Sequence, residues 1–221
     1  METLMGTSAA GDWTKPDNGP RDCARQGSQQ DWPGFFTRLH VCLQAVQVTT
    51  REAVRLEVPE GFTHWEDLCA RVREQEGILF FIGNGASSSM CSHFALDVGK
   101  NARFRTQMFG DAALLTALGN DICFEQIFVE PLRRNARPGD MLVAVSSSGN
   151  SPNVVAAATA ARQAGLRVVT LTGMSPANRM RDLGDLNFWV DADAYGMVET
   201  AHAAILHHWT DRLVARYGGR K

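Results

Sequence analysis

The sequence lacks the features that mark several large classes of protein. It has no C-x-x-C pair, and an odd number of scattered cysteines (Cys23, Cys42, Cys69, Cys91 and Cys123) favours reduced thiols over a disulfide framework. It has no dense run of Lys and Arg, and its formal net charge is only -2, so the electrostatic footprint of a nucleic-acid-binding protein is absent. No apolar run approaches the length of a transmembrane helix, and the N-terminus has no signal-peptide core. These absences predict a soluble, cytoplasmic protein that binds neither nucleic acid nor membrane.

The most informative stretch that is present covers residues 141–164. Residues 141–145 are a short apolar run after a Pro-Gly-Asp turn, which predicts a buried strand. A hydroxyl-rich loop over residues 146–151 follows, and Ser151 with Pro152 suits the start of a helix. Free backbone N–H groups, the helix dipole and several hydroxyls then converge on one point, which predicts a phosphate site. The alternative is an ordinary strand-to-helix turn.

A second loop repeats this arrangement after a strand predicted over residues 78–82. Gly83-Asn84-Gly85 is followed by alanine and three serines and then by a helix over residues 90–98. The loop lacks the third glycine of the dinucleotide fingerprint, no acidic residue follows where a ribose needs one, and no Walker lysine is present. Two Ser/Gly loops on one sheet therefore favour a small phosphorylated ligand over a dinucleotide.

A length of 221 residues with 44 % hydrophobic residues fits one α/β domain with an appendage. Residues 1–31 are poor in apolar side chains and read as a disordered or loosely docked tail, which leaves residues 32–221 for the domain. In residues 35–56 apolar side chains (Phe36, Leu39, Leu43, Val46 and Val54) recur at roughly helical spacing. This stripe either packs on the core or mediates oligomerisation. Thr63 and Glu66 resemble a capping box before a helix over residues 65–75.

The rest of the chain alternates between predicted strands and helices. Further strands are expected over residues 103–109, 166–172 and 188–190, and helices over residues 111–118 (or a turn), 121–135 and 197–217. Repeated strand-loop-helix units predict a parallel sheet with helices on both faces and right-handed crossovers.

These motifs resemble the SIS (sugar isomerase) domain proteins, and within them the phosphoheptose isomerases. The likeness extends over about residues 35–217. Its carriers are Gly83-Asn84-Gly85-Ala86-Ser87, His93-Phe94-Ala95-x-Asp97, Gly119-Asn120-Asp121, the run from Ser146 to Val154, Thr170-Leu171-Thr172-Gly173, and Glu199-x-x-His202-x-x-x-x-His207. The resemblance implies a three-layer α/β/α sandwich with a parallel, flavodoxin-like sheet and N-terminal helices.

The resemblance also implies residue roles. Ser146, Ser147, Ser148 and Ser151 would hold the phosphate; Asn84, Gly85, Ser87, Asp111, Asn120, Asp121 and Glu199 would line the sugar site; Asp97 and His207 would transfer protons. Some family members bind zinc at the positions that here are His93, Asp97, Glu199 and His207. A homotetramer with active sites at subunit interfaces is implied as well. The expected reaction interconverts sedoheptulose 7-phosphate and a heptose 7-phosphate.

Elementary chemistry supports the same roles, because aldose–ketose isomerisation moves protons and uses a carboxylate and an imidazole. His93 and Asp97 are four residues apart and share a helical face, which also suits half of a metal site. His208, beside Trp209, is interpreted as an ordinary packed or solvated histidine.

Three departures from the family pattern stand out. Asp97 is one methylene shorter than the usual glutamate, Glu199 replaces a glutamine, and Ala86 replaces a glycine. On one unbroken helix, Glu199 and His207 would lie about 12 Å apart along the axis. Joint metal binding would thus need Glu199 on a frayed first turn or ligands from different subunits.

Two functions from different classes stay open. The first is a sugar-phosphate isomerase acting through an enediol, on a heptose, hexose, pentose or octose phosphate. The second is a non-catalytic SIS module that binds a sugar phosphate or a partner protein. Retention of Asp97 and His207 favours the enzyme.

Overall fold

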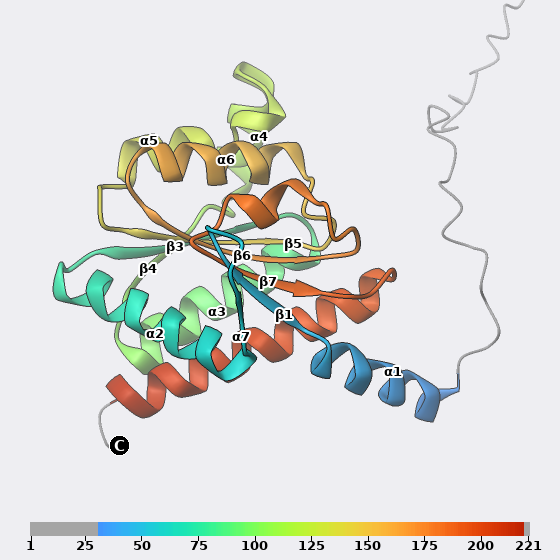
Figure 1. The fold of residues 1–221 in the computed structure, drawn as a ribbon. Helices are drawn as coiled ribbons and strands as arrows, with labels where there is room; N and C mark the ends of the chain where they lie inside the picture. Colours follow the sequence, from blue (N-terminus) through green and yellow to red (C-terminus); the bar gives the residue numbers. More distant parts are fainter. Residues whose placement is uncertain (1–30, 219–221) are drawn as a thin grey trace, which may run out of the picture.

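The computed structural model describes residues 31–218, in which helices cover both faces of one seven-stranded sheet (Figure 1). The strands are β1 (Gln47–Thr50), β2 (Arg55–Leu56), β3 (Ile78–Gly83), β4 (Arg105–Met108), β5 (Met141–Ser146), β6 (Arg167–Gly173) and β7 (Leu186–Val190). The α-helices are α1 (Trp32–Gln44), α2 (Val58–Glu74), α3 (Ala86–Ala102), α4 (Ala112–Asp121), α5 (Val129–Asn135), α6 (Pro152–Gln163) and α7 (Tyr195–Tyr217). The tail predicted over residues 1–31 falls, except for Asp31, outside the described residues.

The strand order is β2-β1-β7-β6-β5-β3-β4. The five strands from β7 to β4 are mutually parallel, whereas β1 runs antiparallel to β7 and to β2. The parallel part therefore has the flavodoxin-like order, in which the chain leaves β3 for β4 and returns on the other side at β5. The predicted α/β sandwich with a parallel sheet is confirmed. Strand order reverses between β3 and β5, so a crevice is expected at their carboxyl ends.

Alternating side chains of the central strands supply two separate cores. On β3, Leu79 and Phe81 pack toward α2, α3 and α7, while Phe80 and Ile82 pack toward α5 and α6 (Figure 1). Because both faces are covered, the central parallel strands β3 and β5 are continuous apolar runs, which is why their positions were predictable. Trp65 of α2 stacks on Trp209 of α7, with ring centroids 4.2 Å apart, and ties the two helices together.

The N-terminal region corrects the prediction of helical spacing over residues 35–56. The helix α1 ends at Gln44, and the chain continues as the antiparallel pair β1–β2. Val46 and Val48 are buried at alternate positions, and β-branched Thr49 and Thr50 follow, so the short segment suits a strand paired between β2 and β7. Val46 and Val48 lie two positions apart because the chain is extended here and its side chains alternate between two faces. They do not continue the apolar stripe of the helix.

The helix α2 begins at Val58, earlier than predicted. Its capping box is formed by Glu57 and Glu60, so the box assigned to Thr63 and Glu66 is wrong. Thr63 lies inside the helix and donates its hydroxyl proton to the carbonyl of Pro59. The Glu66 carboxylate instead pairs with the Arg212 guanidinium of α7.

The helix predicted over residues 121–135 is interrupted. α4 extends to Asp121, a 3-10 turn covers Phe124–Gln126, and α5 follows from Val129. Cys123 has extended backbone dihedral angles, which separates these segments. The other predicted strands and the final helix are confirmed with shifted ends. None of the helices within residues 31–218 is both long enough and apolar enough to span a bilayer.

Candidate functional site

The serine loop, residues 146–151, joins the carboxyl end of β5 to the first turn of α6. Gly149 has a φ of 62°, a left-handed conformation that favours glycine. Ser151 occupies the N-cap position of α6 as predicted, but its hydroxyl caps no backbone N–H and lies 3.1 Å from the hydroxyl of Ser146. In the first turn of α6, Pro152 has no N–H and the Val154 N–H donates to the Asn153 side chain. The Asn153 N–H and the positive end of the helix dipole are left to act on an anion.

The second predicted loop is shorter than expected, because α3 begins at Ala86 and Gly85 is its N-cap residue. Gly83 permits a close approach of Ser87, since a Cβ at residue 83 would lie 2.8 Å from that of Ser87. Asn84 is fixed by a double hydrogen bond with the buried Asn153 of α6, and both N···O distances are 2.9 Å. This amide pair joins the two loops across the point where the strand order reverses.

The two loops together enclose a cavity of about 250 Å³. Its lining contains eight predicted site residues: Asn84, Gly85, Ser87, Ser146, Ser147, Ser148, Ser151 and Glu199. Ala86, Val145 and Tyr195 complete the lining. Tyr195 was not predicted, although it stands four residues before Glu199 and therefore on the same face of α7. Tyr195 is 57 % exposed.

The predicted acid–base residues lie on the adjoining helices α3 and α7. Asp97 Oδ2 is 3.3 Å from His93 Nε2, and the rings of His93 and His207 are 5.7 Å apart between centroids. Phe94 packs edge-on against His207 and orients it. Asp97 is partly buried, while both imidazoles are exposed to solvent. This cluster brings together three of the four side chains predicted to bind metal.

The fourth, Glu199, lies in the serine-loop cavity and belongs to the regular part of α7 rather than to a frayed end. Eight residues of helix separate it from His207, about 12 Å along the axis. Within residues 31–218, no group of three or more His, Cys, Asp and Glu side chains is arranged to hold a metal ion. In one chain the four predicted ligands therefore do not form a single set.

Three further predicted residues lie elsewhere. Asp111 is the N-cap of α4 and accepts a hydrogen bond from the Leu114 N–H, and Asp121 accepts one from the Asn120 side chain. These residues do not line the cavity, and α4 projects beyond α6 at the margin of the molecule (Figure 1). The structure does not join them to the loops within one chain.

One buried histidine, His202, belongs to the C-terminal sequence pattern that begins at Glu199, but the pattern assigns it no role. His202 of α7 is fully buried, and its Nε2 lies 3.0 Å from the carbonyl oxygen of Thr172, at the end of β6. Because a carbonyl only accepts, Nε2 carries the proton and donates. Burial lowers the pKa of His202 to about 4, and the hydrogen bond to Thr172 offsets only part of this effect.

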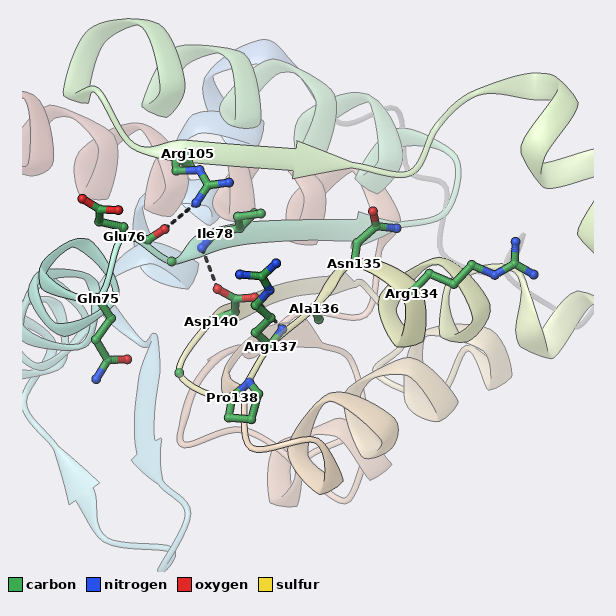
Figure 2. Close-up of a pocket in the computed structure, with 12 residues that line it drawn as sticks. Gln75, Glu76, Ile78, Arg105, Arg134, Asn135, Ala136, Arg137, Pro138 and Asp140 are labelled. Atoms are coloured by element: carbon green, nitrogen blue, oxygen red, sulfur yellow. Dashed lines mark hydrogen bonds between the residues drawn. The ribbon is translucent and has the colours of Figure 1, made fainter.

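A larger hollow of about 400 Å³ lies at the opposite edge of the sheet, where β3, β4 and β5 begin (Figure 2). Its buried Asp140 accepts hydrogen bonds from the N–H groups of Ile78 and Arg137 and so fixes the start of β3. No predicted site residue lines this hollow. The smaller serine-loop cavity is the better candidate, because parallel sheets bind ligands at their carboxyl ends.

Comparison with protein families gives one match over most of the described chain. The model of the SIS domain family matches residues 45–173, which contain both loops of the cavity.

Individual relatives and a solved structure are phosphoheptose isomerases as well. The phosphoheptose isomerase of Akkermansia muciniphila is 36 % identical over 160 residues, which cover 69 % of this chain and 84 % of that protein. The phosphoheptose isomerase of Bordetella avium is 36 % identical over 148 residues, covering 63 % and 75 %. The structure of the phosphoheptose isomerase from Neisseria gonorrhoeae superimposes with a TM-score of 0.71 at 25 % identity, covering 83 % of this chain and 96 % of that one.

Proposed function

Because the chain belongs to the SIS domain family and, within it, to the phosphoheptose isomerases, we propose that it interconverts sedoheptulose 7-phosphate and a heptose 7-phosphate. The observations that carry this proposal are the cavity between two Ser/Gly loops at the carboxyl edge of the sheet and the cluster of a carboxylate and two imidazoles on α3 and α7. Family membership had been predicted from the motifs and is confirmed.

The serine loop would bind the phosphate group. Ser146, Ser147, Ser148 and Ser151 line one cavity, and the N-terminus of α6 adds the Asn153 N–H and the positive end of its dipole. Asn84, held by Asn153, and the nearby Ser87 would contact sugar hydroxyls.

Asp97 and His207 would carry out the proton transfers. Asp97 takes the proton from the carbon next to the carbonyl group; the C–H electron pair forms the double bond of an enediol, and His207 protonates the carbonyl oxygen. Returning a proton to the other carbon, with loss of a hydroxyl proton, forms the new carbonyl group. No oxidant or reductant is consumed. Asp97 is held by His93 and is partly buried, which suits a positioned base.

Zinc is a further part of the proposal, supported by the donor chemistry of His93, Asp97, Glu199 and His207. Since these residues do not form one set in a single chain, no step above passes through a metal. Ligands from two subunits would complete the set in the implied homotetramer. A cytoplasmic location fits this assignment.

The decisive experiment is a coupled assay with sedoheptulose 7-phosphate on the unaltered protein and on Asp97→Asn, His207→Ala and His208→Ala. Loss of an acid–base group is expected to reduce turnover by about 10²–10⁴-fold. His208, the matched control, packs against Phe62 and should retain activity. A chelator arm tests zinc: activity should fall and return with added zinc.

Full turnover by Asp97→Asn would contradict the acid–base assignment, whereas full activity of metal-free protein would contradict only the zinc. Tight sugar-phosphate binding without turnover on heptose, hexose, pentose or octose phosphates would support the alternative, a non-catalytic SIS module.

A further inference from the structure

The segment of residues 174–182, between β6 and β7, lies against the tip of the serine loop. The Met180 N–H donates to the carbonyl of Gly149, with an N···O distance of 3.1 Å. The Arg179 N–H donates to the side-chain oxygen of Asn150, at 3.0 Å. Two consecutive residues of the serine loop are thus held by two consecutive residues of the other segment.

Asn178 is the buried centre of this contact, with only 2 % of its surface exposed. Its Nδ2 donates to the carbonyl of Ser175 at 2.8 Å, which folds the segment back on itself. Its Oδ1 is buried, has no hydrogen-bond partner among the described residues, and lies directly against Gly149. A Cβ added at Gly149 would lie 2.0 Å from Oδ1, so the asparagine occupies the space that a side chain there would need.

The contact continues to Ser148. The Asn150 N–H donates to the Ser148 hydroxyl oxygen at 3.2 Å, and the Asn150 side chain donates to the Ser148 carbonyl at 3.1 Å. Asn150 therefore connects the 174–182 segment to a serine that lines the cavity. Ser148, Gly149 and Asn150 thus belong to one turn, and the Asn178 side chain packs against this turn at Gly149.

We propose that Asn178 is a positioning residue for the phosphate loop: it holds the turn at Gly149 and Asn150 so that Ser148 is aimed at the phosphate. This inference rests on the proposed function of the serine loop. Asn178 does not line the cavity and does not touch the substrate. Its contribution is preorganisation of a loop that would otherwise lose conformational freedom on binding.

The test compares Asn178→Ala with Asn187→Ala. Asn187 is an equally buried asparagine whose side chain donates to Thr170 and Thr172 and which lies outside the 174–182 segment. Both variants are expected to melt at lower temperature. Only Asn178→Ala should weaken inorganic phosphate binding, measured by calorimetry, and raise the KM for sugar phosphate, each about tenfold, with kcat nearly unchanged. Ser148→Ala gives the reference for a directly damaged loop.

Unchanged phosphate affinity in folded Asn178→Ala, or an equal loss in Asn187→Ala, would overturn the proposal. If Asn178→Ala does not fold, Asn150→Ala serves as the test instead. The Asn150 side chain is exposed, and its removal breaks the hydrogen bond from Arg179 that joins the two segments. Unchanged phosphate affinity there overturns the proposal too. Phosphate binding without isomerisation would refute the isomerase but leave this inference intact, whereas no phosphate binding to the unaltered protein refutes both.

Discussion

At the scale of single residues, His202 makes the stability of the protein depend on pH. Its pKa is lowered from 6.5 to about 4 in the folded protein, so between these values the unfolded chain binds a proton that the folded chain excludes. This contribution to stability is fully present above pH 6.5 and is lost as the pH falls toward 4. A shift of this size corresponds to about 3 kcal/mol.

Urea unfolding of the unaltered protein and of His202→Gln at pH 7 and pH 4.5 measures this effect. Glutamine keeps an N–H donor for the Thr172 carbonyl but does not titrate. The unaltered protein should lose more free energy of unfolding on acidification than the variant. Equal losses would show that His202 does not cause the pH dependence.

The residues of the site fall into two groups: those that the local sequence identifies and those that it does not. The serines, Asn84 and Gly85 were predictable, because each follows an apolar strand in a loop of unusual composition. Asn153, Asn178 and His202 were not assigned roles, because their partners lie far away in the sequence. The role of a buried polar side chain depends on its partner elsewhere in the fold, and local sequence patterns do not reveal that partner.

At the scale of secondary-structure elements, α1 presents apolar side chains on two sides. Leu39 and Leu43 pack partly against the core, while Trp32 and Phe36 are 70 % and 50 % exposed. Large exposed aromatic residues on one helix mark an interaction surface. A second subunit of the proposed homotetramer would cover them.

Replacing both aromatic residues, Trp32→Ser with Phe36→Ser, should therefore dissociate the assembly into smaller species in sedimentation at micromolar concentration. The single chain should stay folded, because neither side chain is buried in it. Val54→Ser, which alters a similarly exposed residue on the β1–β2 hairpin, is the control. A compact monomer in the unaltered protein would contradict the predicted assembly.

Elements were predictable where burial on both faces produced continuous apolar runs, as in β3 and β5. The four-residue strand β1 was not, because its pairing with β7 joins residues far apart in the chain. The same holds for the start of α2, where Glu57 and Glu60 form the capping box although Thr63 and Glu66 have the matching spacing. Short strands and helix ends depend on context more than on local pattern.

At the scale of the whole molecule, the proposed site has two parts in each chain. The serine-loop cavity contains Glu199, and the cluster of His93, Asp97 and His207 lies about two helical turns further along α7. Since Glu199 lies in regular helix, fraying does not bring the parts together. We therefore propose a site composed of the cavity of one subunit and the acid–base cluster of its neighbour, in which all four predicted metal ligands would meet.

This arrangement predicts complementation between two variants that each damage a different part of the site. Asp97→Asn damages only the acid–base cluster and Ser148→Ala only the phosphate loop, so each pure assembly carries one lesion in every site. In mixed assemblies made by co-expression, a shared site can take its cluster from the Ser148→Ala subunit and its loop from the Asp97→Asn subunit. Such sites are free of lesions, so isomerisation of sedoheptulose 7-phosphate should exceed the sum of the two separate activities several-fold. A mixture no more active than that sum would place both parts of the site within one subunit. The double variant Asp97→Asn with Ser148→Ala, co-expressed with either single variant, is the control, because none of its mixed sites can be intact.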